Sequence, residues 1–250
     1  MDGRIEQAAQ ILAEARRKRD QIGALPEALA PKTMAEAHAM QDVVAKLLGE
    51  TVRGWKINAP PGQDANRGAL LGSTVMESPA RYPASKLHRF ILEGEVAFRF
   101  DRDMPARGKP YEEEEVLAAV TAFPAIEFVD YRFADPRSVP ALDKVADHSS
   151  NGGFVMGKPV SDWRRLDIKN LHVTLKVDGK VTWDKTIGHP LGNPFIPLIA
   201  MPTVMSQAGG IKAGQVVTTG TCTGMTYMEP GQHAEVIFEG LGSVEVTLVK

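Results

Sequence analysis

Apolar and polar positions in the first fifty residues follow the period of an α-helix. Between residues 5 and 19, apolar side chains recur at spacings of three and four, at Ile5, Ala8, Ile11, Leu12 and Ala15. This spacing puts them on one face and predicts an amphipathic helix. A second helix is predicted from Thr33, which has the spacing of a capping box with Glu36, to Gly49, which supplies the stop.

After residue 49 the pattern changes to short apolar segments that are typical of β-strands. We predict strands at residues 52–57, 90–100, 125–133, 171–177, 180–183, 215–219, 234–238 and 243–249. Asp178 and Gly179 lie between two of these segments and predict a hairpin turn, because glycine readily takes a positive φ. The chain is therefore predicted to be mainly β after its two helices.

Two further helices are predicted within this β-rich part. One begins at Pro110 or Tyr111 and ends at Ala122, with acidic residues in its first turn, where the helix dipole favours them. The other begins at Asn193 and ends at Gly209, with a kink expected at Pro202.

Composition limits the class of protein. The chain has 250 residues, of which 43% are hydrophobic and 24% charged, a balance that favours one compact soluble domain. Lys and Arg number 29 against 31 Asp and Glu, so the net charge of −2 attracts neither nucleic acid nor an anionic membrane. A small molecule is the expected partner.

The cellular compartment is predicted from two further features. Cys222 is the only cysteine, so an intramolecular disulfide is excluded and a cysteine-based zinc site is disfavoured. The N-terminal segment lacks the apolar block of a signal peptide, and the longest apolar stretch, residues 194–205, is too short to span a bilayer. We therefore expect a cytoplasmic protein.

Three glutamates are the strongest candidates for chemistry. Glu93 and Glu95 lie two residues apart in a predicted strand and therefore share one face, and Glu127 lies between apolar residues in another strand. If the three converge, repulsion and desolvation raise their pKa values unless a cation neutralises them. Ligation by oxygen alone favours magnesium first, with manganese or calcium as alternatives.

The alternative is that Glu93 and Glu95 are exposed residues of an ordinary edge strand and that Glu127 is an unrelated ion-pair partner. Taken alone, the spacing favours this second interpretation, because two acids two residues apart are common.

Lys56 is a candidate for acid, base or electrostatic chemistry. It lies between Trp55 and Ile57 in a predicted strand, where an apolar pocket or a nearby metal can depress its pKa. Snorkelling to the surface is the alternative. Residues 220–224, which include Thr221 and Cys222, form either a substrate-facing turn or a strand end, and the cysteine is expected to be a packed, inert thiol.

Other kinds of site are disfavoured by spacing. The six histidines are scattered, with no pair at the spacing of a helical zinc motif. A serine-hydrolase elbow of the Gly-x-Ser-x-Gly type is also absent from the sequence.

In combination and in order, several segments resemble the fumarylacetoacetase superfamily, specifically its 2-keto-4-pentenoate hydratase and 4-oxalocrotonate decarboxylase branch. The resemblance runs from about Thr51 to the C-terminus. The segments that carry it are Gly54-Trp55-Lys56-Ile57, Glu93-Gly94-Glu95-Val96-Ala97-Phe98, Ala125-Ile126-Glu127-Phe128-Val129-Asp130, Gly153-Phe154-Val155-Met156-Gly157, Leu191-Gly192-Asn193-Pro194 and Gly240-Leu241-Gly242-Ser243-Val244.

The resemblance implies both a fold and a site. The fold is α+β, a mixed β-sandwich roll, with residues 1–50 as a helical segment packed on a catalytic roll of residues 51–250. The implied magnesium or manganese ligands are Glu93, Glu95 and Glu127. Family members act on 2-oxo or 2-hydroxydienoic acids from bacterial aromatic-ring degradation and form dimers or larger assemblies, so a homo-oligomer is expected. The residues implied to face or lie near the substrate are Lys56, Asp147 and Ser150, and Thr221 of the possible substrate-facing turn is a further candidate for substrate binding.

The sequence also departs from its relatives. Many hydratases carry adjacent acidic residues in the loop that corresponds to residues 67–75, where this chain has Gly72 and Ser73. His148 stands where asparagine is common. Because histidine titrates near neutrality, His148 is a candidate to replace the lost proton carrier, and a structural histidine is the alternative.

These features together predict a divalent-metal-dependent lyase that adds water to a 2-hydroxydienoate or 2-oxo-alkenoate. The alternatives are a 4-oxalocrotonate-type decarboxylase or an acylpyruvate-type carbon–carbon hydrolase. A non-catalytic partner subunit that keeps the fold is an alternative of another class, which the missing acidic pair favours.

Overall fold

The computed structural model describes residues 3–186 and 188–250 of the chain. Its α-helices are α1 (Gly3–Lys18), α2 (Met34–Leu48), α3 (Glu113–Leu117), α4 (Ala141–Ala146) and α5 (Phe195–Met205). The chain also has short 3-10 helices: η1 (Gly72–Thr74), η2 (Ala84–Lys86), η3 (His148–Ser150), η4 (Trp163–Arg165), η5 (Ile168–Asn170) and η6 (Ser206–Ala208).

Both predicted N-terminal helices are present. The Thr33 side chain caps α2 by accepting a hydrogen bond from the Glu36 N–H at 3.2 Å. The Glu36 carboxylate accepts instead from the Lys32 N–H, at 2.7 Å, so it binds the residue before the cap. α2 ends before Gly49, as predicted.

The strands form two main sheets. The larger sheet has the order β2 (Asn66–Leu71), β1 (Val52–Asn58), β12 (Val216–Thr221), β5 (Ile91–Phe100), β7 (Val120–Val129), β8 (Asn151–Met156) and β3 (Val75–Glu77), with β13 (Thr226–Tyr227) paired to β5. The smaller sheet has the order β10 (Lys180–Thr186), β9 (His172–Val177), β14 (His233–Phe238), β15 (Gly242–Val249) and β4 (Ala80–Pro83). A two-stranded ribbon joins β6 (Met104–Pro105) and β11 (Gly210–Ile211).

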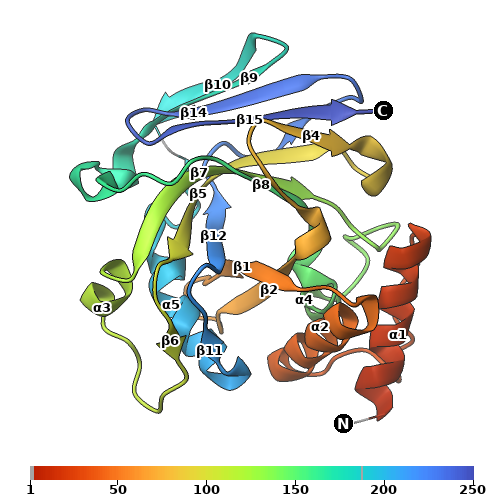
Figure 1. The fold of residues 1–250 in the computed structure, drawn as a ribbon. Helices are drawn as coiled ribbons and strands as arrows, with labels where there is room; N and C mark the ends of the chain where they lie inside the picture. The colour runs from red at the N-terminus through yellow and green to blue at the C-terminus, as the bar shows by residue number, and fades with distance from the viewer. Residues whose placement is uncertain (1–2, 187) are drawn as a thin grey trace.

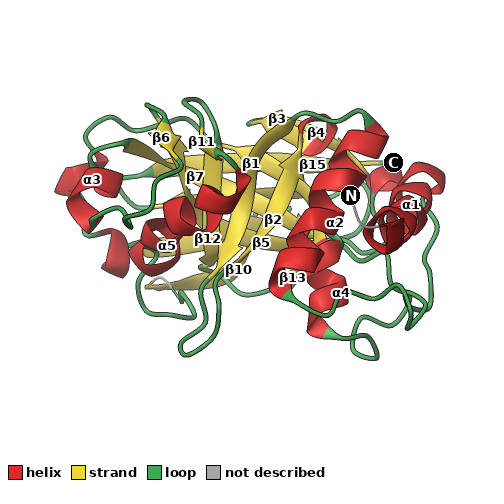
Figure 2. Cartoon of the chain, turned by 90° about the horizontal axis from the view of Figure 1, so that it is seen from below, coloured by secondary structure: helices red, strands yellow, loops and turns green. Residues whose placement is uncertain are grey.

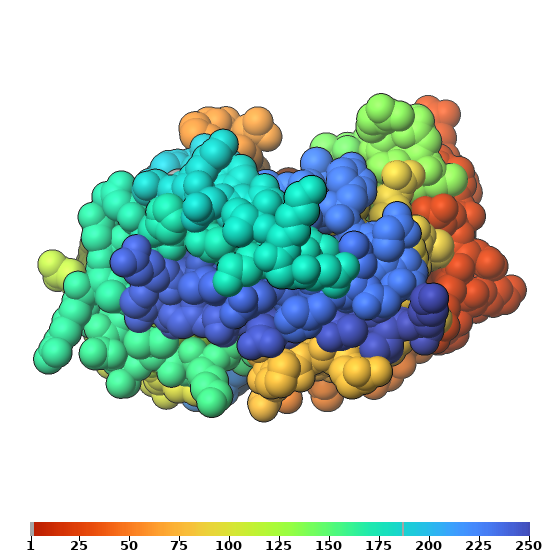
Figure 3. All heavy atoms as spheres, turned by 90° about the horizontal axis from the view of Figure 1, so that it is seen from above, coloured from red at the N-terminus to blue at the C-terminus, as the bar shows by residue number. Residues whose placement is uncertain are grey.

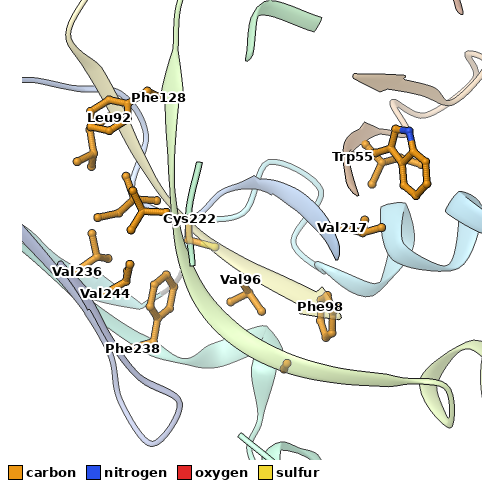
Figure 4. Close-up of a cluster of buried hydrophobic side chains, with 14 of the residues drawn as sticks. Trp55, Leu92, Val96, Phe98, Phe128, Val217, Cys222, Val236, Phe238 and Val244 are labelled. Atoms are coloured by element: carbon orange, nitrogen blue, oxygen red, sulfur yellow. The ribbon is translucent and has the colours of Figure 1, made fainter. Parts of the chain in front are cut away.

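The larger sheet curls into a roll, and the smaller sheet packs on its outside (Figure 1). Seen from above, the strands of the smaller sheet cover this face of the molecule (Figure 3). Figure 4 shows the apolar core between the sheets, where Val236 and Val244 of the smaller sheet lie near Leu92 and Phe128 of the larger one. This is the α+β sandwich roll that the sequence predicted.

The inside of the roll has a separate apolar cluster. Alternate side chains of a strand point to opposite faces, so the residues of β5 on the face opposite Leu92 point inward. The cluster contains residues from five strands that the curling brings together: Leu70, Ala97, Phe123, Ala125, Phe154 and Val216. It fills one end of the interior with hydrocarbon.

Strand direction decides what lies at the other end. β1 is parallel to β12, whereas β5 is antiparallel to both β12 and β7. The carboxyl ends of β1, β12 and β7 therefore meet the start of β5 at one end of the roll. Residues late in these three strands and early in β5 lie close together there.

Helices cover the outside of the roll (Figure 2). α1, α2 and α4 share an apolar core of their own, which includes Leu12, Met40, Val44 and Ala146. α4 comes from the later part of the chain, so the helical layer is not built from residues 1–50 alone. The division of the chain at residue 50 stays a prediction. None of the helices in the described part of the chain is long and apolar enough to cross a membrane.

Several predicted boundaries are wrong. The helix expected from Pro110 to Ala122 is only the short α3, because residues 120–129 form β7 and satisfy their backbone groups through β5 and β8. The strand expected at residues 125–133 accordingly begins and ends earlier. The hairpin of β9 and β10 is confirmed, with Asp178 at φ 49° and Gly179 at φ 77°.

Gly54 sets the spacing between β1 and β12. A Cβ on this residue would lie 2.0 Å from the carbonyl oxygen of Val216. We expect Gly54→Ala to lower the free energy of unfolding by about 1–3 kcal/mol, since two paired strands must move apart. Urea unfolding measures the change. Gly23→Ala, with no atom within 4 Å of the added carbon, is the control, and equal losses in the two variants would contradict the expectation.

Candidate metal centre

Three glutamates meet inside the roll, at the end opposite the apolar cluster. Glu93 of β5 lies directly across from Glu127 of β7, and Glu95 follows on the same face of β5. One carboxylate oxygen from each lies within 4.8 Å of the others. Glu95 and Glu127 are buried and β5 is a central strand, so the interpretation as exposed residues of an edge strand is wrong.

Burial makes this cluster electrostatically unfavourable without a counter-charge. Burial and the neighbouring Glu127 raise the pKa of Glu93 to about 7. Burial, Glu127 and Glu93 together raise the pKa of Glu95 well above its usual value. With all three glutamates ionised and Lys56 protonated, the cluster has a formal charge of −2, which one divalent cation cancels.

Lys56 belongs to the same cluster. Its Nζ lies 2.8 Å from Glu127 Oε1. Burial lowers the pKa of Lys56, but attraction to Glu127, Glu93 and Glu95 outweighs burial, so the pKa is raised above its usual value. The depressed pKa considered for Lys56 from the sequence is therefore wrong. The alternative, in which its side chain snorkels to the surface, is also wrong, because the ammonium group binds Glu127.

Neighbouring groups fix two of the three carboxylates. Glu95 Oε2 accepts hydrogen bonds from the Thr218 hydroxyl and, at 2.9 Å, from the Gly220 N–H. Gly220 has φ 113°, a conformation that favours glycine and turns this N–H toward the carboxylate. Glu127 Oε1 accepts from Lys56 and, at 2.9 Å, from the Asn151 side-chain amide.

Two oxygen atoms of the site have no hydrogen-bond partner among the described residues, and they show whether the site suits a cation. Glu127 Oε2 is buried and accepts no hydrogen bond from the described residues. Thr221, paired with Glu95 across β12 and β5, likewise has a buried hydroxyl without a partner in the described chain. A buried carboxylate oxygen without a hydrogen-bond donor destabilises the folded chain unless a bound ligand interacts with it. The residues present therefore fit a hard cation.

The open end of the roll lies beside these residues. Met225 and Tyr227 are large side chains that are 57% and 71% exposed, and Tyr227 pairs with Ile91 at the start of β5. The half-buried Tyr131 follows β7 at the same end, and burial, together with Glu93, raises the pKa of its hydroxyl despite the opposing effect of Lys56. In Figure 3 the edge of the molecule is hollowed between a light-orange and a green segment.

Asp147 and Ser150 lie in a buried polar turn beside the helical layer. Asp147 accepts from Arg16 at 2.6 Å and from the Arg132 Nε at 3.1 Å, so both its oxygens are engaged by arginine. The Ser150 carbonyl accepts from the Asp130 N–H at 2.9 Å. The predicted substrate contacts of Asp147 and Ser150 stay predictions.

His148 occupies the same turn and is fully buried. Neither of its ring nitrogens has a hydrogen-bond partner in the described chain. Burial, followed by repulsion from Arg16, Arg132 and Arg67, lowers its pKa well below 6.5. The expectation that His148 titrates near neutrality is therefore wrong. Its role as a proton carrier stays a prediction.

Ser73 lies on the outside of the roll, where its N–H and hydroxyl bind the Glu50 carboxylate. The missing acidic pair at Gly72 and Ser73 therefore falls at a surface turn. Cys222 is buried, and burial raises the pKa of its thiol, as expected for a packed and inert cysteine.

Three contributors to the centre were missed from the sequence: Thr218, the Gly220 N–H and the Asn151 amide. Gly220 was noticed only as part of a turn. Thr218 and Asn151 carry no spacing signal, because they reach the glutamates through pairing between strands far apart in the chain.

Comparison with known proteins identifies the family. Residues 66–249 match the family described as fumarylacetoacetate hydrolase C-terminal, which is more than half of the chain. The chain belongs to this family.

Curated relatives in the fumarylacetoacetate hydrolase family extend the match over nearly the whole chain. The 2-keto-4-pentenoate hydratase of Paraburkholderia phymatum is 30% identical and aligned over 98% of both chains. That of Paraburkholderia xenovorans is 28% identical over 96% of this chain and 93% of its own length. A solved structure, the 4-oxalocrotonate decarboxylase of Pseudomonas putida G7 complexed with magnesium and adipate, has a TM-score of 0.84 at 20% identity, covering 100% of this chain and 98% of that one. At that identity it confirms the fold alone.

Asp147 tests the role of the buried turn. We expect Asp147→Asn to lower the free energy of unfolding by about 3–5 kcal/mol, because two buried arginines lose their shared carboxylate. Urea unfolding at pH 7 measures the change, with the exposed Asp20→Asn as control. A variant as stable as the wild type but with a raised KM would contradict the structural role and favour substrate binding.

Proposed function

We propose that this chain is a divalent-metal-dependent hydratase that adds water to a 2-hydroxydienoate by way of the corresponding 2-oxo-alkenoate. The observation that carries the proposal is the buried cluster of Glu93, Glu95, Glu127 and Lys56 at the open end of the roll. Supporting it are the relatives named 2-keto-4-pentenoate hydratase, which align over almost the full chain. We expect a place in the bacterial breakdown of aromatic compounds.

Glu93, Glu95 and Glu127 would hold the cation. Oxygen-only ligation and a buried formal charge of −2 favour magnesium, with manganese as the alternative. When bound, the cation supplies Lewis acidity toward the carboxylate and 2-oxo oxygens of the substrate.

The chain's own residues then have distinct tasks. Lys56 keeps its positive charge beside Glu127, where it stabilises negative charge on the enolate oxygen or moves a proton to it. The Thr221 hydroxyl has no partner among the described residues and is available beside Glu95 as a donor to substrate. A dienol that shifts its proton becomes an alkene conjugated to the carbonyl, and water adds at the alkene carbon farthest from that carbonyl.

The same stabilised enolate serves two other outcomes. Loss of carbon dioxide from an oxalocrotonate, or cleavage of a carbon–carbon bond in an acylpyruvate, leaves electrons on the same oxygen. A relative named 4-oxalocrotonate decarboxylase, 30% identical over 61% of this chain, keeps the first of these as the second candidate. We further propose that the protein is cytoplasmic and self-associates.

Turnover of a defined dienoate tests the proposal. Purified protein with magnesium is incubated with 2-hydroxypenta-2,4-dienoate, and the loss of diene absorbance is followed. We expect loss that requires the metal and stops when a chelator is added. Carbon dioxide release from 4-oxalocrotonate without hydration would move decarboxylation to first place. No turnover of several dienoates or of oxalocrotonate would favour a non-catalytic partner subunit.

Lys56→Met provides the matched variant for this assay. We expect kcat to fall at least about 100-fold, because the charge beside the enolate is lost. Metal affinity is expected to be retained, since the three glutamates remain. Lys109→Met, at a lysine 77% exposed, is the control. Unchanged turnover in Lys56→Met would contradict the assigned role.

A further inference from the structure

A second polar cavity lies away from the glutamates, between the end of α1 and the roll. It has a volume of about 320 Å³ and is lined by the basic residues Arg16, Arg17, Arg19, Lys86 and Arg132, with Glu50 as the acidic side chain among its lining residues. In Figure 1 the end of α1 lies beneath the turn that follows β4, which contains Lys86. The net charge of the whole chain is −2, so this gathering of positive charge is local.

The floor of the cavity is a paired network. Arg16 binds Asp147 at 2.6 Å, and Arg132 binds Asp147 at 3.1 Å and Asp130 at 3.0 Å. The two guanidinium groups thus share Asp147, and Asp130 binds Arg132. The network neutralises itself and holds α1 on the roll.

The positive charges at the rim of the cavity, those of Lys86 and Arg19, are not neutralised by carboxylates. Lys86 donates to the Ser73 carbonyl at 2.8 Å, a neutral acceptor. Arg19 is exposed and its side chain makes no ion pair or hydrogen bond with any described residue. Glu50 is occupied by the N–H and hydroxyl of Ser73.

The charges around the cavity do not cancel. The lining cations are counted here with their ion-pair partners, and with Lys18, which shares Glu14 with Arg17. Six cations then face the four carboxylates of Glu14, Glu50, Asp130 and Asp147, which leaves a formal excess of two positive charges. Arg17 has a further neutral acceptor in the Leu47 carbonyl and lies 3.6 Å from Glu14 outside the cavity. Burial, followed by repulsion from Arg132, lowers the pKa of Arg16 to about 10, although Asp147 and Asp130 act in the opposite direction.

We propose that this cavity binds a small dianion, either a phosphate group or a dicarboxylate. A volume of about 320 Å³ has room for a small anion such as phosphate or a short dicarboxylate. Guanidinium groups pair with carboxylate and phosphate through two parallel hydrogen bonds, and the ammonium of Lys86 adds a point charge. Two negative charges match the excess on the cavity wall.

A chain of hydrogen bonds through Asn151 connects the wall of the cavity to Glu127 of the metal centre. Arg132 also donates to the Asn151 carbonyl at 3.3 Å, and the Asn151 amide binds Glu127. A bound dianion would hold Arg132 and the turn in place. The proposal does not depend on the hydratase function, since it concerns a different set of side chains.

Calorimetric titration of the metal-loaded protein tests the site. Inorganic phosphate and succinate are titrated separately at low ionic strength, with acetate as the monovalent comparison. We expect at least one dianion to bind more tightly than acetate. Tighter phosphate indicates a phosphate ligand, and tighter succinate a dicarboxylate. In the double variant Arg19→Gln, Lys86→Met the dissociation constant is expected to rise about tenfold or more.

Two further variants make the result specific. Arg137→Gln, Lys109→Met removes one arginine and one lysine that are 95% and 77% exposed outside the cavity, and it should bind like the wild type. Glu95→Gln should also keep the dianion, because it alters only the metal centre. Binding no tighter than acetate, unchanged binding in the Arg19, Lys86 variant, or loss of binding in Glu95→Gln would each overturn the proposal.

Discussion

The arrangement of the whole site depends on one unfavourable contact, that of Glu93 with Glu127 across two buried strands. Like charges directly opposite each other in a sheet repel, and burial removes the water that would screen them. Glu95 adds a third negative charge and Lys56 returns one positive charge. The unfavourable electrostatic energy of the three buried glutamates is explained if they hold a divalent cation. Apolar side chains at these positions would stabilise the fold better if the glutamates had only a structural role.

The roll gives this contact its place. Three strands run in the same direction and deliver Lys56, Glu127 and the Gly220 N–H to one end, while an apolar cluster fills the other. A turn with three successive residues at positive φ, residues 148–150, then carries Asn151 to Glu127. Such conformations cost of order 1–3 kcal/mol each, and the arginines that bind Asp147 hold the turn in place.

Local periodicity predicted the helices at the front and most long strands. The convergence of the glutamates was implied only by the family resemblance, because their spacing alone favoured an ordinary edge strand. Prediction from the sequence failed where tertiary pairing decides. Residues 120–122 join a central strand instead of continuing a helix, and Thr218 reaches Glu95 from a strand more than 120 positions away. The pKa of Lys56 is raised because attraction to three acids outweighs burial, and the pKa of His148 is lowered by burial and by repulsion from three arginines. Neither balance can be read from spacing along the chain.

Metal binding by glutamate variants tests the account most directly. Titration calorimetry with manganese should find one tight site per chain in the wild type, and binding should weaken by more than about 100-fold in Glu95→Gln and Glu127→Gln. Glu113→Gln, at an exposed glutamate of α3, should bind as the wild type does. Manganese affinity that is unchanged in both Glu95→Gln and Glu127→Gln would contradict the central claim.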